Sequence, residues 1–222
     1  MILQLLRDPV NGVITLLILL PVLIISLTFH EYMHGLAAYA MGDPTPKNSR
    51  RLTLNPLNHL DPIGAIALLF AGFGWAKPVP INPYYLKKPK RDMALIAFAG
   101  PLSNLLLCFV GLVWFYLWQV FPIIQMPTVV TTAFQYFIIL NINLAVFNLI
   151  PFPPLDGSKI VFSVLSDKTY YKLMEYEKYG MLALFILLMT GRFNGIISGV
   201  SSWILTGFQN FILSVLKLIG VL

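Results

Sequence analysis

Three long apolar stretches without charged residues decide the class of protein to which this chain can belong. No residue from Val13 to Phe29 carries a charge, and uncharged apolar stretches recur at 93–121 and 128–150. About 20 apolar residues are enough for a helix to cross a bilayer. Apolar residues make up 58% of the chain and charged residues 11%, whereas soluble domains have about 45–50% and about 25%. A soluble domain and a disordered chain are therefore excluded, and a polytopic membrane protein is predicted.

The remaining apolar segments differ in length. Segments 179–190 and 194–222 extend the pattern of spans, whereas 63–75 has only 13 residues and contains three glycines. Because 13 residues are few for a spanning helix, we expect 63–75 to enter and leave the membrane on one side. The prolines of 151–154 cannot continue a helix, so the helix must break there. We expect an all-α membrane protein with five to six transmembrane segments, one short re-entrant segment and this broken helix.

The basic residues indicate how the chain is oriented in the membrane. The connections 42–62, 76–92 and 151–178 hold 12 of the 15 lysines and arginines. If 63–75 is re-entrant, these connections share one side, and the positive-inside rule places that side in the cytoplasm. If 63–75 crosses fully, the basic connections divide between the two sides. The net charge of +6 then reflects membrane orientation, and no nucleic-acid partner is expected.

Smaller features give local expectations. Arg51-Leu52-Thr53-Leu54 alternates in polarity, which predicts a short strand. Gly100-Pro101 predicts a kink or break within 93–121. The single cysteine, Cys108, excludes an intrachain disulfide and lies in an apolar run, which indicates a small core residue.

A metal-binding pattern lies inside the first apolar segment. His30-Glu31-Tyr32-Met33-His34 is an H-E-x-x-H motif. In a helix, residues four apart lie on one face, so His30 and His34 can bind one zinc ion while Glu31 reaches a water on it. Ionisable groups at membrane depth are costly and usually functional. The motif therefore predicts a hydrolytic zinc site rather than a structural polar cluster.

A zinc site with two histidines needs a third protein ligand and an open position for water. Asp156 is the favoured candidate because it follows the proline-rich break at the end of an apolar span, where a turn can aim a carboxylate inward. His59, the third histidine, is the alternative.

These motifs together resemble the site-2 protease family of intramembrane zinc metalloproteases. That family pairs H-E-x-x-H with a later N-x-x-P-x-x-x-L-D-G motif, and residues 148–157 match this motif throughout. Segments 74–80 and 99–104 also resemble stretches of compact prokaryotic members. The resemblance covers about residues 20–160. A PDZ domain between the motifs, which some relatives have, has no room in this sequence.

The resemblance implies both the site and the activity. His30, His34 and Asp156 would bind one Zn²⁺ per chain, Glu31 would act as general base, and Asn148 would lie near the substrate carbonyl. The substrate would be a transmembrane segment of another protein, cleaved in the bilayer of a prokaryotic plasma membrane by a site open to the cytoplasm. We expect one protease domain over 1–222, with a catalytic core at about 12–160 and further spans at about 172–222. The sequence leaves the oligomeric state open.

Two other functions compete with this interpretation. One is a membrane H-E-x-x-H protease that trims prenylated C-termini, which would need a different third ligand. The other is a non-enzymatic zinc-binding scaffold or metal transporter, which has no need for the base Glu31. For a protease, the unwound substrate could pair with an exposed backbone edge, and 51–54 and 79–81 are the candidate edges.

Overall fold

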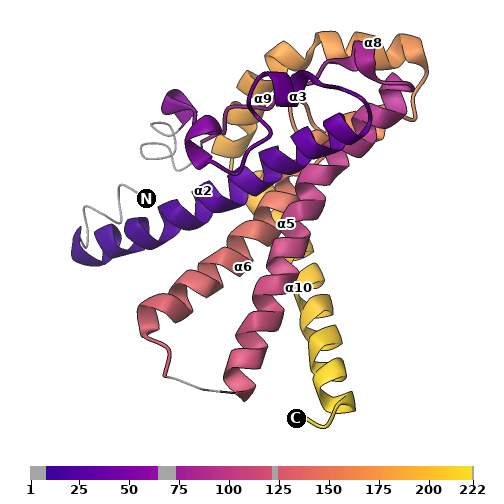
Figure 1. Cartoon of the computed structure of the whole chain (residues 1–222). Helices are drawn as coiled ribbons and strands as arrows, with labels where there is room; N and C mark the ends of the chain where they lie inside the picture. Colours follow the sequence, from indigo (N-terminus) through magenta and orange to yellow (C-terminus); the bar gives the residue numbers. More distant parts are fainter. Residues whose placement is uncertain (1–8, 65–73, 122–124, 222) are drawn as a thin grey trace.

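The computed structural model describes residues 9–64, 74–121 and 125–221, and this part of the chain is helical without a strand (Figure 1). The all-α prediction is therefore confirmed. The helices are α2 (Pro9–Ala40), α3 (Thr45–Asn48), α5 (Pro89–Val120), α6 (Thr128–Asn148), α7 (Asp156–Phe162), α8 (Asp167–Glu175), α9 (Glu177–Met189) and α10 (Arg192–Leu218), with 3₁₀ turns at Pro56–Asn58 and Pro83–Tyr85.

Four of these helices are long and apolar enough to cross a membrane, by length and composition. The spanning parts are Asn11–Ala40, Pro89–Val120, Thr128–Asn148 and Phe193–Leu218. The expected span at 179–190 forms α9, whose 13 residues measure about 20 Å, less than the roughly 30 Å of a bilayer's hydrocarbon. The described residues therefore provide four full spans and one shorter apolar helix.

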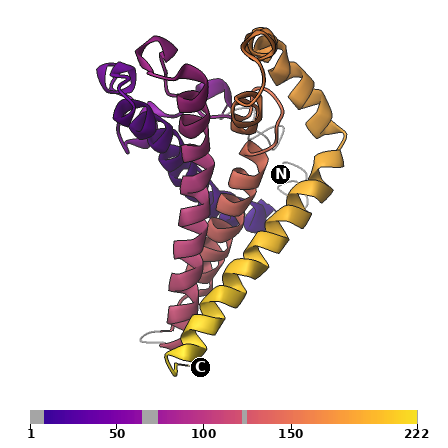
Figure 2. The same ribbon diagram turned by 90° about the vertical axis from the view of Figure 1, so that its right-hand side faces the viewer.

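Helix α5 lies at the centre of the bundle. It packs against α2, α6 and α7, while α10 lies along α6 and α5 on the outside (Figure 2). One apolar core joins α5, α6 and α10, and its buried members are Cys108, Leu112, Ile138, Ile142, Ile212 and Leu216. The prediction that Cys108 is a core residue is confirmed. Helix α5 also continues through Pro101, so the chain does not break at Gly100-Pro101.

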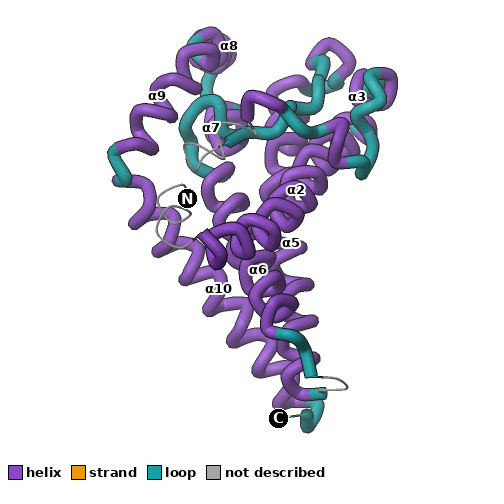
Figure 3. The backbone as a smooth tube through the Cα atoms, turned by 90° about the vertical axis from the view of Figure 1, so that its left-hand side faces the viewer, coloured by secondary structure: helices purple, strands orange, loops and turns teal. Residues whose placement is uncertain are grey.

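The charged connections gather at one end of the bundle. Figures 1 and 3 show α3, α7 and α8 at this end, whereas the end of α5, the start of α6 and the C-terminus lie at the other. The helix break predicted in the proline-rich stretch is confirmed, because α6 ends at Asn148 and α7 begins at Asp156.

The segment between Asp43 and Pro83 differs from expectation. Residues 51–54 form no strand, because Arg51 is buried and its guanidinium donates to the carbonyl oxygens of Lys77 and Pro78. An isolated antiparallel bridge instead joins Leu60 to Ala76. Most of the predicted re-entrant segment 63–75 lies outside the described residues, at 65–73. Its two flanks lie side by side, since the Lys77 backbone N–H also donates to the His59 carbonyl at 2.9 Å.

Candidate metal centre

The first half of the site is a single helical turn. His30 and His34 lie on one face of α2, and both are buried, with 4% and 7% of their surface exposed. Their Nε2 atoms are 3.0 Å apart, and their rings meet edge to face. The spacing of four residues therefore directs two imidazole nitrogens toward one point, as the sequence predicts.

The second half comes from the helix break. Asp156 is the first residue of α7, and its Oδ2 lies 3.1 Å from His30 Nε2 and 3.2 Å from His34 Nε2. Among the described residues, His30, His34 and Asp156 form the one group of histidine, cysteine or carboxylate side chains placed to share a metal ion. The structure thus brings together the three predicted ligands, although Asp156 lies more than 120 positions from the two histidines in sequence.

The donor set fits a zinc ion. In a tetrahedral site with bonds of about 2.0–2.1 Å, neighbouring ligand atoms lie about 3.3 Å apart, close to the three distances above. His34 Nδ1 lies 2.7 Å from the Ile96 carbonyl oxygen, which can only accept, so Nδ1 carries the proton and Nε2 presents a lone pair. A carboxylate beside such a nitrogen gives two electron-pair donors facing one another, an arrangement that a cation stabilises.

The charge at Asp156 is tied to the state of the two imidazoles. Burial alone would raise the pKa of the Asp156 carboxyl, but protonated His34 and His30 imidazoles outweigh burial and hold that pKa well below its usual range. A bound metal ion would take the place of those imidazole protons, because it binds neutral imidazoles and an ionised carboxylate.

Two glycines permit the close approach of these elements. A Cβ at Gly100 of α5 would lie 2.4 Å from His34 Nε2 and 2.7 Å from His30 Cε1. A Cβ at Gly157 would lie 2.2 Å from the Leu149 carbonyl oxygen. The sequence motifs contain both glycines, but only the structure shows that Gly100 forms the floor beneath the two imidazoles.

A cavity of about 160 Å³ opens beside the three ligands. It is lined by the ligands themselves and by Glu31, Asn148, Pro78, Val79, Ile81 and other residues of α5 and α7. Glu31 Oε2 accepts a hydrogen bond from the Val79 backbone N–H at 2.9 Å. Asn148 Nδ2 donates to the Leu144 carbonyl at 3.0 Å. Both predicted non-ligand residues therefore line the cavity of the candidate metal centre.

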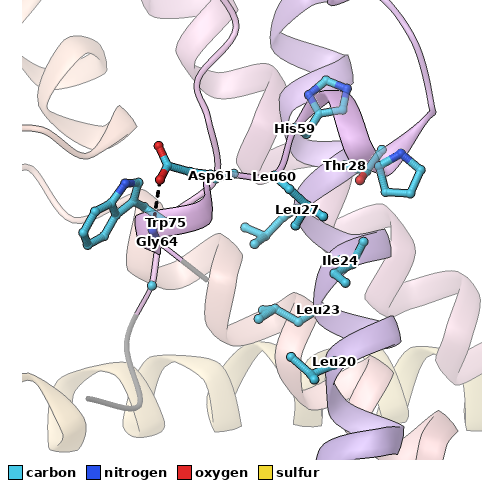
Figure 4. Close-up of a pocket in the computed structure, with 13 residues that line it drawn as sticks. Leu20, Leu23, Ile24, Leu27, Thr28, His59, Leu60, Asp61, Gly64 and Trp75 are labelled. Carbon is cyan, nitrogen blue, oxygen red and sulfur yellow. Dashed lines mark hydrogen bonds between the residues drawn. The ribbon is translucent and has the colours of Figure 1, made fainter. Parts of the chain in front are cut away.

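His59, the alternative ligand, lies elsewhere. It lines a separate apolar cavity of about 200 Å³ against Leu20, Leu23, Ile24 and Leu27 of α2 (Figure 4). Its Nε2 lies 2.8 Å from the Thr53 carbonyl oxygen, so it supports the loop that carries it. Its ring does not belong to the group formed by His30, His34 and Asp156.

Two residues that fix the wall of the site cavity could not be recognised from the sequence. Asp43 is fully buried, and its Oδ2 accepts from the Asn82 N–H at 2.7 Å. Arg51 holds the same segment at Lys77 and Pro78. Their contacts cross more than 25 positions of sequence, so no local pattern could reveal them.

Comparison with known proteins identifies relatives of the chain. The model of peptidase family M50 matches residues 18–129 and 120–191. The Bacillus subtilis (strain 168) protein "Putative zinc metalloprotease YwhC" is 42% identical over 171 residues, which are 76% of this chain and 78% of that protein. Two mycobacterial proteins named "Putative zinc metalloprotease Rip2" are more distant. The Mycolicibacterium smegmatis protein is 29% identical over 77% of this chain and 66% of its own length. The Mycobacterium tuberculosis H37Rv protein is 28% identical over 82% of this chain and 70% of its own length.

No solved structure matches the chain. The family model nevertheless covers most of its length, and both halves of the metal centre lie within the matched residues. These findings favour a protease over a zinc scaffold or metal transporter. The chain therefore belongs to peptidase family M50, the site-2 protease family, and is a zinc metalloendopeptidase of the membrane.

Proposed function

We propose that this enzyme hydrolyses a peptide bond in or near a transmembrane segment of another membrane protein. One observation carries the proposal: a single cavity, set among membrane-spanning helices, is lined by His30, His34, Asp156, Glu31 and Asn148. This combination provides a metal site, a proton acceptor and a hydrogen-bond donor in one place. Those are the parts that peptide hydrolysis by a metalloprotease requires.

His30, His34 and Asp156 would hold one zinc ion per chain, which leaves the fourth position of a tetrahedral site open. Zinc supplies a Lewis acid that makes water more acidic and polarises a peptide carbonyl.

Glu31 would act as the general base. Its Oε2 is held by the Val79 N–H, so Oε1 remains to accept a proton from the attacking water. When the C–N bond breaks, Glu31 would return this proton to the leaving amine nitrogen. The backbone contact fixes the carboxylate beside the ligands without neutralising it, because a neutral amide is the donor.

Asn148 would bind the oxygen of the scissile carbonyl. Its side-chain amide has two N–H donors, and the Leu144 carbonyl uses one of them. The second N–H can donate to the negative charge that develops on the carbonyl oxygen during attack.

A substrate helix must unwind locally, because its amides are hydrogen-bonded within the helix. Of the two candidate edges for pairing with an extended substrate, 51–54 forms no strand, whereas Val79 and Ile81 line the cavity. The segment 79–81 therefore is the better candidate to contact the unwound chain.

The decisive experiment uses detergent-purified protein and a model substrate with one transmembrane span. We expect Glu31→Gln to retain about one zinc per chain and to lose cleavage, and Asp156→Ala to lose zinc. Glu175→Gln on α8 is the matched control for Glu31→Gln, because it makes the same change on an exposed surface. Full zinc content in Asp156→Ala would contradict the ligand set, and normal cleavage by Glu31→Gln would contradict the general base.

We also propose that the site opens toward the cytoplasm of a prokaryotic cell. Asp156 belongs to α7, and α7 lies at the end of the bundle that carries the basic connections (Figure 3). Because Cys108 is the only cysteine and is buried, single cysteines at Lys87 and Gln125 can report the orientation. We expect a membrane-impermeant thiol reagent added to intact cells to label Gln125→Cys and to spare Lys87→Cys. The reverse pattern would contradict the orientation.

A further inference from the structure

Three polar side chains lie behind His30, among apolar helices. Ser26 belongs to α2, Asn104 to α5 and Asn141 to α6, and each has 0% of its surface exposed. None of them lines the cavity that holds the candidate ligands. Buried amides are costly unless fully hydrogen-bonded, and packing of apolar helices does not require them. Their contacts therefore point to a role beyond packing.

The amide of Asn141 has a fixed orientation. Its Nδ2 lies 2.8 Å from the Phe137 carbonyl oxygen, which can only accept. The same nitrogen lies 2.9 Å from Ser26 Oγ, whose own proton is donated to the Val22 carbonyl at 2.8 Å. Both neighbours therefore require the amino group on this side, and Asn141 Oδ1 must face Asn104.

The amide of Asn104 is fixed in turn. Its Nδ2 donates to Asn141 Oδ1 at 2.9 Å and to the Ser26 carbonyl oxygen at 3.3 Å. Both N–H groups are then used, so Oδ1 faces the His30 ring, 2.6 Å from Nδ1. An amide oxygen cannot donate a proton, so Nδ1 of His30 must carry one. The lone pair of His30 then lies on Nε2, the atom that faces His34 and Asp156.

We propose that Asn104, oriented by Asn141 and Ser26, is the positioning residue that holds His30 in its zinc-binding tautomer. This rests on the proposed role of His30 as a zinc ligand. If the Asn104 amide rotated by half a turn, its amino group would face Nδ1 and would favour the tautomer protonated on Nε2, which cannot bind metal. Asn141 and Ser26 prevent that rotation.

The test is zinc affinity, measured by competition with a chelator. Loss of a group that orients a metal-binding histidine typically weakens binding by about 10–100-fold. We expect a loss in this range for Asn104→Leu and a smaller loss for Asn141→Leu. Asn104→Asp keeps an oxygen facing His30 and should bind zinc within a few-fold of wild type. Asn143→Leu, the same change at a half-buried position of α6 outside the network, is the matched control and should leave affinity unchanged.

Thermal stability separates positioning from packing. Leucine suits an apolar helix interface better than a carboxylate, so a packing role predicts that Asn104→Leu is the better tolerated variant in both measurements. The positioning role predicts that the two measurements rank the variants in opposite ways. Asn104→Leu should have the higher melting temperature, whereas Asn104→Asp should bind zinc more tightly. The chain has only three histidines, so nitrogen NMR of ¹⁵N-histidine-labelled protein can also show directly whether His30 carries its proton on Nδ1.

The outcomes are distinct. Wild-type zinc affinity in Asn104→Leu would overturn the proposal, and so would equal weakening by Asn104→Leu and Asn104→Asp. His30→Ala distinguishes this result from failure of the ligand set itself. If His30→Ala retains full zinc, the proposed ligands are wrong, whereas loss of zinc in His30→Ala but not in Asn104→Leu overturns the positioning role alone.

Discussion

The two halves of the metal centre are built in different ways. The helix half, with His30, Glu31 and His34, lies on one uninterrupted helix, α2. The junction half, residues 148–156, is an irregular connection between α6 and α7 that delivers Asp156 to the two imidazoles. Helical geometry brings the side chains of the first half near one another, and contacts with α5 then orient the two imidazoles. The second half depends on an approach so close that a Cβ at Gly157 would lie 2.2–2.5 Å from backbone atoms of Leu149 and Ile150. The junction half is therefore the one that small changes in packing should damage most.

The largest effect is expected at Gly157, in the junction half. A Cβ there would lie 2.2 Å from the Leu149 oxygen and 2.4 Å from its carbonyl carbon, and backbone atoms cannot move cheaply. Gly157→Ala should displace α7 and Asp156, weaken zinc binding by about 100-fold or more and lower the melting temperature. Chelator competition and thermal unfolding measure the two effects. Gly207→Ala on α10, which has open space for the methyl group, is the control. Wild-type zinc affinity in Gly157→Ala would contradict the tight packing of the junction half.

Gly100→Ala is expected to have the next largest effect, and it acts on the helix half. The added methyl would meet His34 and His30 side-chain atoms at 2.4–2.7 Å, and these rings can turn away at the cost of their alignment. We expect zinc binding to weaken by about 10–100-fold, with a smaller loss of thermal stability than in Gly157→Ala. In Gly111→Ala, also on α5, the nearest neighbours of the added methyl are Phe137 and Ile138 side-chain atoms at 3.1–3.3 Å, and zinc affinity should stay intact. If Gly100→Ala and Gly111→Ala lost zinc affinity equally, the loss would reflect the general packing of α5 and not the contact of Gly100 with the imidazoles.

Asp43→Ala should reduce cleavage without affecting zinc. Asp43 accepts from the Asn82 and Thr45 backbone N–H groups, and an unpaired buried N–H costs about 1–3 kcal/mol. The segment that carries Val79 should then hold Glu31 less well, which lowers the turnover rate several-fold. Asp167→Ala, at a largely exposed carboxylate, is the control. A loss of zinc in Asp43→Ala would instead indicate that this segment supports the ligands.

The smallest effect is expected for Asp167→Asn, which belongs to neither half. The Lys90 Nζ–Asp167 Oδ1 pair spans 2.9 Å between α5 and α8, and the Asp167 side chain is 79% exposed. Exposed pairs contribute about 0–1 kcal/mol, so the melting temperature should change by no more than about 2–4 °C. Zinc affinity should stay at the wild-type value, and a measurable loss would show that the position of α8 affects Asp156.

The helix half could be predicted from the sequence because its information is local. The spacing of His30 and His34 specifies one helical face, and the spans at 93–121 and 128–150 became α5 and α6. Asp156 could be predicted because its motif marks the helix break. Ser26, Asn141, Asp43 and Arg51 could not, because an isolated polar residue in a sequence does not show which distant atom it contacts. The strand predicted at 51–54 was wrong for the same reason, because the distant contacts of Arg51 determine the local backbone conformation.

Because α2 is longer than the bilayer is thick, the depth of the candidate metal site in the membrane depends on bilayer thickness. Its 32 residues measure about 48 Å, whereas the hydrocarbon layer is about 30 Å thick. The helix must therefore tilt or extend beyond the lipid, and Figure 1 shows it crossing the other spans obliquely. His30 and His34 lie in the final third of α2, so their depth below the lipid headgroups depends on that tilt. For the proposed transmembrane substrate, the lipid composition of the membrane would then help to select which peptide bond lies level with the proposed metal ligands.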